Sequence, residues 1–127
     1  MVSKFANSTD GLIYVSETDA LFEYVSFPKI GELSAANVAR AAGIDTSAPA
    51  TVSDHESFFR RLVENKDWFG PKEKEQTKRF KKLKELLEKE LTDIKVFRFG
   101  KIRIDILIVG KNVEGKVEGL RTYSVET

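Results

Sequence analysis

The hydrophobic positions of this chain change their spacing several times, which is typical of a domain that mixes helices and strands. Short aromatic and β-branched runs at residues 12–15 and 22–27 predict two strands, and Pro28 ends the second run. Ser34, a following alanine-rich stretch and Gly43 predict a short helix with a residue suited to each cap.

Two more helices are predicted in the middle of the chain. Residues 46–52 have the Ser, Ala and Pro content of a loop, after which Ser53 or Asp54 can cap a helix that residues 66–71 interrupt. Residues 72–91 predict a long helix. The apolar positions that share a face are Phe58, Phe59 and Leu62 in the first helix, and Phe80, Leu83, Leu87, Leu91 and Ile94 in and just beyond the second.

The last third of the chain has the two-residue period of strands. Residues 96–99, 101–109 and 120–125 predict a three-stranded antiparallel meander joined by glycine-containing turns. In the middle strand, alternate residues fall on opposite faces, and we expect the isoleucine face to pack against helices. One face carries Ile102, Ile104, Ile106 and Ile108, and the other carries Lys101, Arg103 and Asp105 before Leu107 and Val109. The elements together predict an α+β fold.

Composition favours one domain over residues 1–127, because 127 residues with 41% hydrophobic content suit a single core. The net charge of +1 gives no strong attraction to nucleic acid or to an anionic membrane. Zero cysteines and one histidine exclude disulfides, thiolate metal sites and His-rich zinc sites. Residues 1–10 lack the apolar core of a signal peptide and no apolar run reaches the length of a membrane span, so we expect a cytoplasmic protein.

Catalytic motifs are sparse. His55 falls in the first turn of a predicted helix without a recognisable nucleophile motif, so solvated helix surface is the favoured interpretation over a general base. For Asp105 and Arg103, a structural ion pair is the favoured interpretation over a functional buried acid. The sequence has no Gly-rich phosphate loop, no paired catalytic acids and no zinc-ligand spacing. We therefore expect a protein that is not an enzyme and needs no cofactor.

A basic stripe in the long helix keeps a second hypothesis open. Five basic side chains fall within seven residues, and they could neutralise phosphates in a salt-dependent way. They are Lys78, Arg79, Lys81, Lys82 and Lys84. Over residues 72–91, however, eight basic residues oppose five glutamates, which favours a solvated amphipathic face over a nucleic-acid site.

Three further features each permit an ordinary and a functional interpretation. Trp68 lies in a connection between helices, where it would be either a lid on the core or an exposed interface anchor. The Ser16-Glu17 turn would either cap an element or present Glu17 outward. The predicted last strand runs directly into Glu126 and Thr127, so a carboxylate and a hydroxyl would lie together at the rim of the domain.

Several short segments distributed along the chain match one known family. They are Asp10-Gly11-Leu12 with Ser16-Glu17, Phe22-Glu23, Ser57-Phe58-Phe59, Asp67-Trp68, Lys95-Val96-Phe97-Arg98-Phe99-Gly100, Asp105 with Ile108-Val109-Gly110, and Val125-Glu126-Thr127. The spacing from Asp67-Trp68 to the end of the chain matches without a gap. On these segments, the chain resembles the nuclease A inhibitor family over nearly its whole length.

The resemblance implies an α/β/α sandwich whose largely antiparallel sheet is flanked by helices. It also implies a partner, a sugar-nonspecific, metal-dependent nuclease of the ββα-metal type, bound by an inhibitor that is monomeric when free. Glu17, Trp68 and the Thr127 end, with Glu126 beside it, would enter the active-site region, and Thr127 would approach the nuclease's magnesium ion through bound water. The inhibitor itself would hold no metal.

Two departures from the family concern the charge of this surface. The segment after Trp68 is rich in acid in the family but reads Phe-Gly-Pro-Lys-Glu-Lys here, which predicts slower association with a basic nuclease. Lys66 stands where the family contributes a glutamine amide, and a cationic cleft would repel it. The alternative hypothesis is a protein-interaction module of the same fold with a different partner.

Overall fold

The computed structural model describes residues 13–15, 19–27, 33–45, 47–60 and 70–125. Its largest element is a five-stranded antiparallel sheet with the strand order β3-β7-β6-β5-β4. The strands are β3 (Glu23–Phe27), β4 (Ala50–Asp54), β5 (Thr92–Phe99), β6 (Arg103–Lys111) and β7 (Val117–Val125). A separate antiparallel pair consists of β1 (Ile13–Val15) and β2 (Asp19–Leu21).

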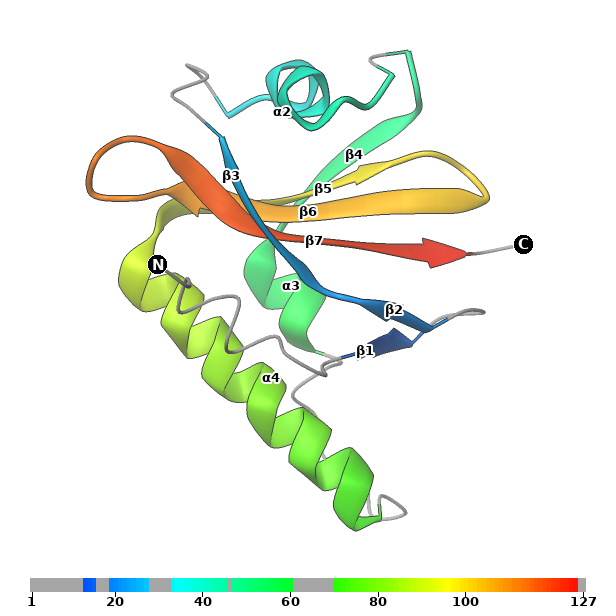
Figure 1. Ribbon diagram of the computed structural model, residues 1–127, viewed down its shortest axis with the longest axis vertical. Helices are drawn as coiled ribbons and strands as arrows, with labels where there is room; N and C mark the ends of the chain where they lie inside the picture. The colour runs from blue at the N-terminus through cyan, green and yellow to red at the C-terminus, as the bar shows by residue number, and fades with distance from the viewer. Residues whose placement is uncertain (1–12, 16–18, 28–32, 46, 61–69, 126–127) are drawn as a thin grey trace.

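Helices cover both faces of this sheet. Helix α2 (Ala35–Ala42) lies on one face, and α3 (His55–Arg60) and α4 (Pro71–Glu90) lie on the other (Figure 1). The predicted α+β class and the α/β/α sandwich are therefore confirmed. The predicted meander is also confirmed, since β5, β6 and β7 are consecutive neighbours.

Strand β6 divides its apolar side chains between two cores. Ile104, Ile106 and Ile108 pack in the core under α3 and α4, whereas Leu107 and Val109 pack in the core under α2. Each such side chain stabilises the fold by about 1.5–3 kcal/mol when fully buried. The prediction that Ile102 shares the buried isoleucine face is wrong, because it precedes the strand in the β5–β6 connection and is 63% exposed.

The helix boundaries follow local chemistry. At the start of α2, the Ser34 side chain accepts a hydrogen bond from the backbone of Asn37, and Gly43 ends the helix in the left-handed conformation at a φ of 74°. Helix α4 begins with Pro71, which suits a first helical position because its missing N–H would be unpaired there. The predicted caps of α2 are confirmed, and the long helix lies within one residue of its predicted bounds at each end.

The predicted loop at residues 46–52 is wrong over its second half. Residues from Ala50 onward form β4, which pairs with β5 along its whole length. All five residues of this edge strand are exposed, so no buried alternation identifies it in the sequence. These residues form a strand because their backbone pairs with β5, which is distant in the sequence.

Candidate partner-binding site

The final described strand, β7, ends just before the two C-terminal residues that the sequence predicts to bind a partner. Val125 is the last residue of β7 and pairs with Arg103 on β6. The predicted site residues Glu126 and Thr127 follow directly but lie outside the described residues. The structure therefore describes the strand that leads to them.

The β1–β2 pair lies beside this same half of β7. Both strands contact β7, and continuing the β3–β7 register from Glu23 back along the chain brings β2 level with the last residues of β7 (Figure 1). The predicted Glu17 lies between β1 and β2, outside the described residues. The backbone leading toward Glu17 and the backbone leading toward Thr127 are thus neighbours.

The predicted Lys66 and Trp68 also lie outside the described residues, between the end of α3 at Arg60 and the start of α4. A described contact joins α4 to the strands near Glu17. The ring of Phe22, which lies between β2 and β3, meets the ring of Phe80 on α4 edge-on, with 5.6 Å between centroids. The choice between a core lid and an interface anchor for Trp68 stays open.

Charged and aromatic side chains gather on the α2 side of the sheet near the end of β7. The Arg103 guanidinium lies 4.2 Å from the centroid of the Tyr123 ring, close enough for a cation–π interaction. The Asp105 carboxylate is 3.8 Å from Arg103 Nε and 3.7 Å from Arg121 Nη2. The predicted pair of Asp105 with Arg103 is confirmed, and Arg121 is an additional partner that the sequence pattern did not indicate.

Arg121 also joins this group to α2. Its Nη1 donates a hydrogen bond of 3.1 Å to the carbonyl oxygen of Ala42, the last residue of the helix. A cation is favourable there because the last carbonyls of a helix lack backbone partners and carry partial negative charge. We call Arg103, Asp105, Arg121 and Tyr123 the terminal cluster. It connects the end of β7 with β6 and α2.

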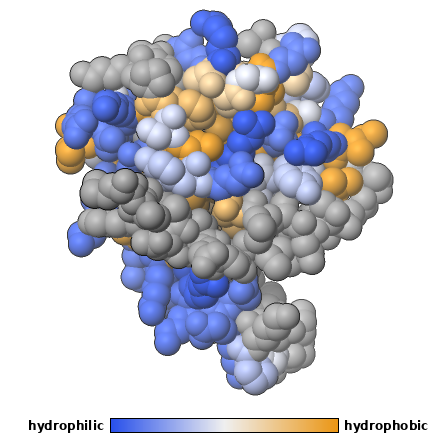
Figure 2. Space-filling view, in the orientation of Figure 1, coloured by the Kyte–Doolittle hydropathy of each residue, from blue (hydrophilic) through white to orange (hydrophobic). Residues whose placement is uncertain are grey.

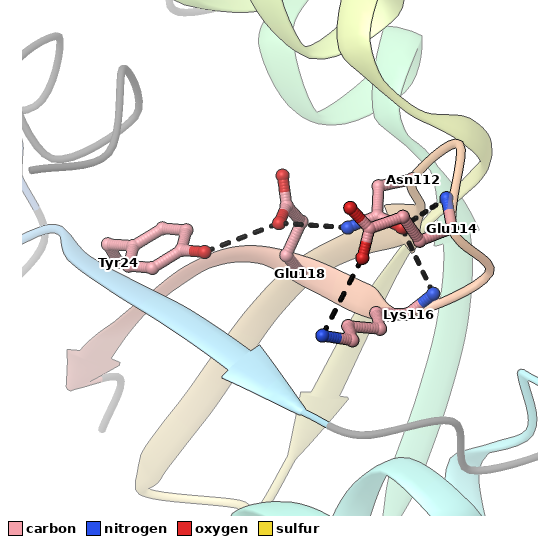
Figure 3. Close-up of polar contacts among 5 residues, drawn as sticks. All are labelled: Tyr24, Asn112, Glu114, Lys116 and Glu118. Atoms are coloured by element: carbon pink, nitrogen blue, oxygen red, sulfur yellow. Dashed lines mark hydrogen bonds and ion pairs between the residues drawn. The ribbon is translucent and has the colours of Figure 1, made fainter. Parts of the chain in front are cut away.

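The opposite end of β7 is organised around Asn112 (Figure 3). The Asn112 Oδ1 accepts hydrogen bonds from the backbone N–H groups of Glu114 and Lys116, and its Nδ2 donates to Glu118. The Tyr24 hydroxyl donates to the same Glu118 oxygen, Oε2, at 3.3 Å. This hairpin network ties the β6–β7 turn to the edge strand β3.

His55 does not behave as the freely solvated residue that the sequence favoured. Its Nε2 lies 3.0 Å from Glu88 Oε2 on α4, and only 17% of its side chain is exposed. Preceding it, Asp54 accepts a hydrogen bond from the backbone N–H of Ser57, which lowers the pKa of this carboxyl below its ordinary value, with a smaller contribution from the Ser57 side chain. The predicted capping role of Asp54 is confirmed.

The long helix presents its lysines outward, as its pattern predicts. Lys78, Lys81 and Lys82 are exposed, and α4 carries the hydrophilic surface seen over the lower half of the molecule (Figures 1 and 2). Acidic residues interrupt this basic surface, as shown by the Lys84 Nζ to Glu88 Oε1 distance of 4.0 Å. Nothing in this arrangement tests the nucleic-acid hypothesis.

The structure is an α+β sandwich with a group of charged side chains near the end of its last strand. A comparison with known families shows to which family the chain belongs. The chain belongs to the family described as nuclease A inhibitor-like protein, which matches residues 1–127. Membership in an inhibitor family agrees with a protein that acts by binding. A sequence comparison with curated proteins finds no match. In the described part of the chain, no helix combines the length and the apolar character needed to cross a membrane.

Proposed function

We propose that this protein is a stoichiometric inhibitor of a metal-dependent, sugar-nonspecific nuclease, and that it blocks the active site with Glu17, Trp68 and the Thr127 end. The observation that carries the proposal is the match of the whole chain to the nuclease A inhibitor-like family. The contacts of β1 and β2 with β7 support the surface, because the chain segments that flank Glu17 and Thr127 are neighbours.

The chemistry of a nuclease active site explains why carboxylates and an aromatic side chain would bind there. A nuclease active site is electropositive and holds a hard cation that prefers oxygen ligands. The Thr127 carboxylate satisfies these groups without offering a phosphodiester bond to cleave, and it approaches the magnesium ion through water. Glu17 pairs with a cationic side chain of the cleft, Glu126 adds a second carboxylate beside the terminus, and Trp68 is the desolvated aromatic anchor.

Lys66 is the one proposed contact that opposes binding. Because a lysine is repelled by a cationic cleft, Lys66→Gln should tighten the complex, by roughly threefold to tenfold for one partly screened charge. An association rate measured at two salt concentrations identifies the cause, since the gain should shrink as salt rises. A loss of affinity in Lys66→Gln would place Lys66 among the favourable contacts.

The direct test is a titration of the protein into a magnesium-activated, nonspecific nuclease from the same genome. We expect activity to fall linearly to an end point at one inhibitor per nuclease. Raising the magnesium concentration controls for chelation and should leave the end point unchanged. Full activity in the presence of excess protein would contradict the proposal and favour an interaction module with another partner.

Weak nucleic-acid binding is the second candidate, and the exposed Lys78, Lys81 and Lys82 are the observation in its favour. It predicts direct binding to DNA that falls steeply with salt and is lost in Lys81→Glu with Lys82→Glu. Under the inhibitor proposal the same double variant inhibits the nuclease as well as the parent chain does.

A further inference from the structure

Two helices on the same face of the sheet bring three potential metal ligands together. His55 and Glu56 are the first residues of α3, and Glu88 lies in the last turn of α4, 33 positions beyond His55. The donor atoms of these three side chains all lie within 4.8 Å of one another. None of these three residues belongs to the proposed nuclease-binding surface.

The spacing within the cluster is close to that of ligands sharing one ion. The His55 Nε2 and Glu88 Oε2 atoms are 3.0 Å apart. Two ligands at about 2.0–2.1 Å from a tetrahedral zinc ion are separated by roughly 3.3 Å. Small side-chain rotations would therefore suffice to place the donor atoms around one ion.

The donor set selects a class of ion. Carboxylates alone suit magnesium or calcium, whereas an imidazole nitrogen with carboxylates suits zinc and neighbouring divalent transition metals. We propose that His55, Glu56 and Glu88 form a binding site for Zn²⁺ or a similar divalent transition metal, with water completing the coordination. This site is independent of the proposed inhibitory function.

The electrostatic surroundings favour a cation. Glu88 lies near the carbonyl end of the 20-residue helix α4, where a positive ion is stabilised. The start of α3 carries partial positive charge, which opposes a cation, but this helix has only six residues. Lys84 is a competing charge, and its Nζ lies 4.0 Å from Glu88 Oε1, the oxygen that does not face His55. Asp54 is already engaged with the Ser57 backbone, so it adds negative charge to the site without being a ligand.

A bound ion would join α3 to α4 and so stabilise the native fold. An ion that binds the folded chain and not the unfolded chain raises the melting temperature in proportion to the logarithm of its concentration once the site is saturated. His55 is mostly buried already, so little freedom is lost when its ring is fixed.

Calorimetric titration of ZnCl₂ into the EDTA-treated full chain tests the site. We expect one zinc per chain, a higher melting temperature with zinc that EDTA reverses, and no displacement by millimolar Mg²⁺. His55→Gln, Glu56→Gln and Glu88→Gln should each weaken binding by about tenfold or more, because each removes a direct ligand. Glu85→Gln is the matched control, since it removes the same charge from an exposed position of α4 outside the cluster.

Several outcomes of the same titrations would overturn the proposed metal site. The absence of one-to-one binding in the parent chain would overturn the proposal, as would an equal loss of affinity in Glu85→Gln and Glu88→Gln. Unchanged affinity in His55→Gln or Glu56→Gln would overturn the three-ligand site. Circular dichroism of the metal-free variants shows whether each is folded, and nuclease inhibition should be the same with and without zinc.

Discussion

The two ends of β7 are built from different kinds of contact. At the hairpin end, Asn112 and Glu118 bind the turn and Tyr24 of the neighbouring strand β3 through hydrogen bonds. At the other end, the terminal cluster joins separate elements through charges, and one of its members, Arg103, has 65% of its side chain exposed. The hydrogen bonds of the hairpin end satisfy one turn and its neighbouring strand β3, while the terminal cluster connects β7 and β6 with α2 through charged side chains.

This difference separates two tasks along one strand. Hydrogen bonds that satisfy a turn stabilise the fold locally but offer little to a partner. Exposed charges contribute less to stability, yet they can hold a strand end in position and meet a charged partner. We therefore expect changes at the hairpin end to alter stability alone, and changes at the terminal end to alter inhibition as well.

The largest effect is expected at Gly119, which lies between the two ends. A Cβ at this position would collide with the backbone carbonyl oxygen of Ile108 on β6. Gly119→Ala should lower the free energy of unfolding by about 3 kcal/mol or more, measured by urea denaturation, because backbone must move. Gly43→Ala is the control, since a Cβ there meets nothing within 4 Å and costs only the strain of its left-handed conformation, about 1 kcal/mol.

At the hairpin end, Asn112→Ala removes one acceptor from two backbone N–H groups and one donor from Glu118. We expect a loss of about 1.5 kcal/mol in the free energy of unfolding, with unchanged inhibition at temperatures where the protein is folded. Glu114→Gln in the same turn should change stability little, because its pair with Lys116 is exposed. Weaker inhibition by folded Asn112→Ala would break the division between the two ends.

At the terminal end, Arg121→Met removes the link from Asp105 to the Ala42 carbonyl. We expect a loss of about 1 kcal/mol in stability and a threefold to tenfold weaker complex with the nuclease, since β7 is held less firmly against α2. Arg40→Met provides the comparison, because Arg40 is exposed in the last turn of the same helix and should leave inhibition unchanged. Equal inhibition by Arg121→Met and the parent would show that the cluster serves stability alone.

The smallest effect is expected at Ser124, a fully buried residue of β7 whose hydroxyl has no hydrogen-bond partner among the described residues. Ser124→Ala should be neutral or stabilising by up to about 1 kcal/mol, because it removes a buried polar group that gains nothing. Thr122→Ala is the contrasting variant, since Thr122 is buried on the same face but is not without an interaction partner, and the loss of its side chain should destabilise the protein.

Much of the fold could be predicted because its signals are local. The three-residue and four-residue spacing of Phe80, Leu83 and Leu87 indicated α4, and alternation from Ile104 to Val109 indicated a strand with two distinct faces. The caps of α2 could be predicted for the same reason, since Ser34 and Gly43 act on backbone groups of their immediate neighbours.

Other features depend on contacts between distant segments. β4 has no buried face of its own and exists through its pairing with β5. The pair of His55 with Glu88 and the bond from Arg121 to Ala42 span 33 and 79 positions, so no local spacing indicates them. The binding residues Glu17, Lys66, Trp68, Glu126 and Thr127 come from the resemblance to the family and stay predictions, because they lie outside the described residues.

The central claim is that the free carboxylate of Thr127 enters the active site of a nuclease. It is tested most directly by comparing the dissociation constant of the parent chain with that of a chain amidated at Thr127, after both are shown to unfold at the same urea concentration. Amidation removes one charge and keeps every side chain. We predict a complex at least about tenfold weaker, because a carboxylate facing a metal site is replaced by a neutral group. Equal dissociation constants for the two forms would contradict the claim.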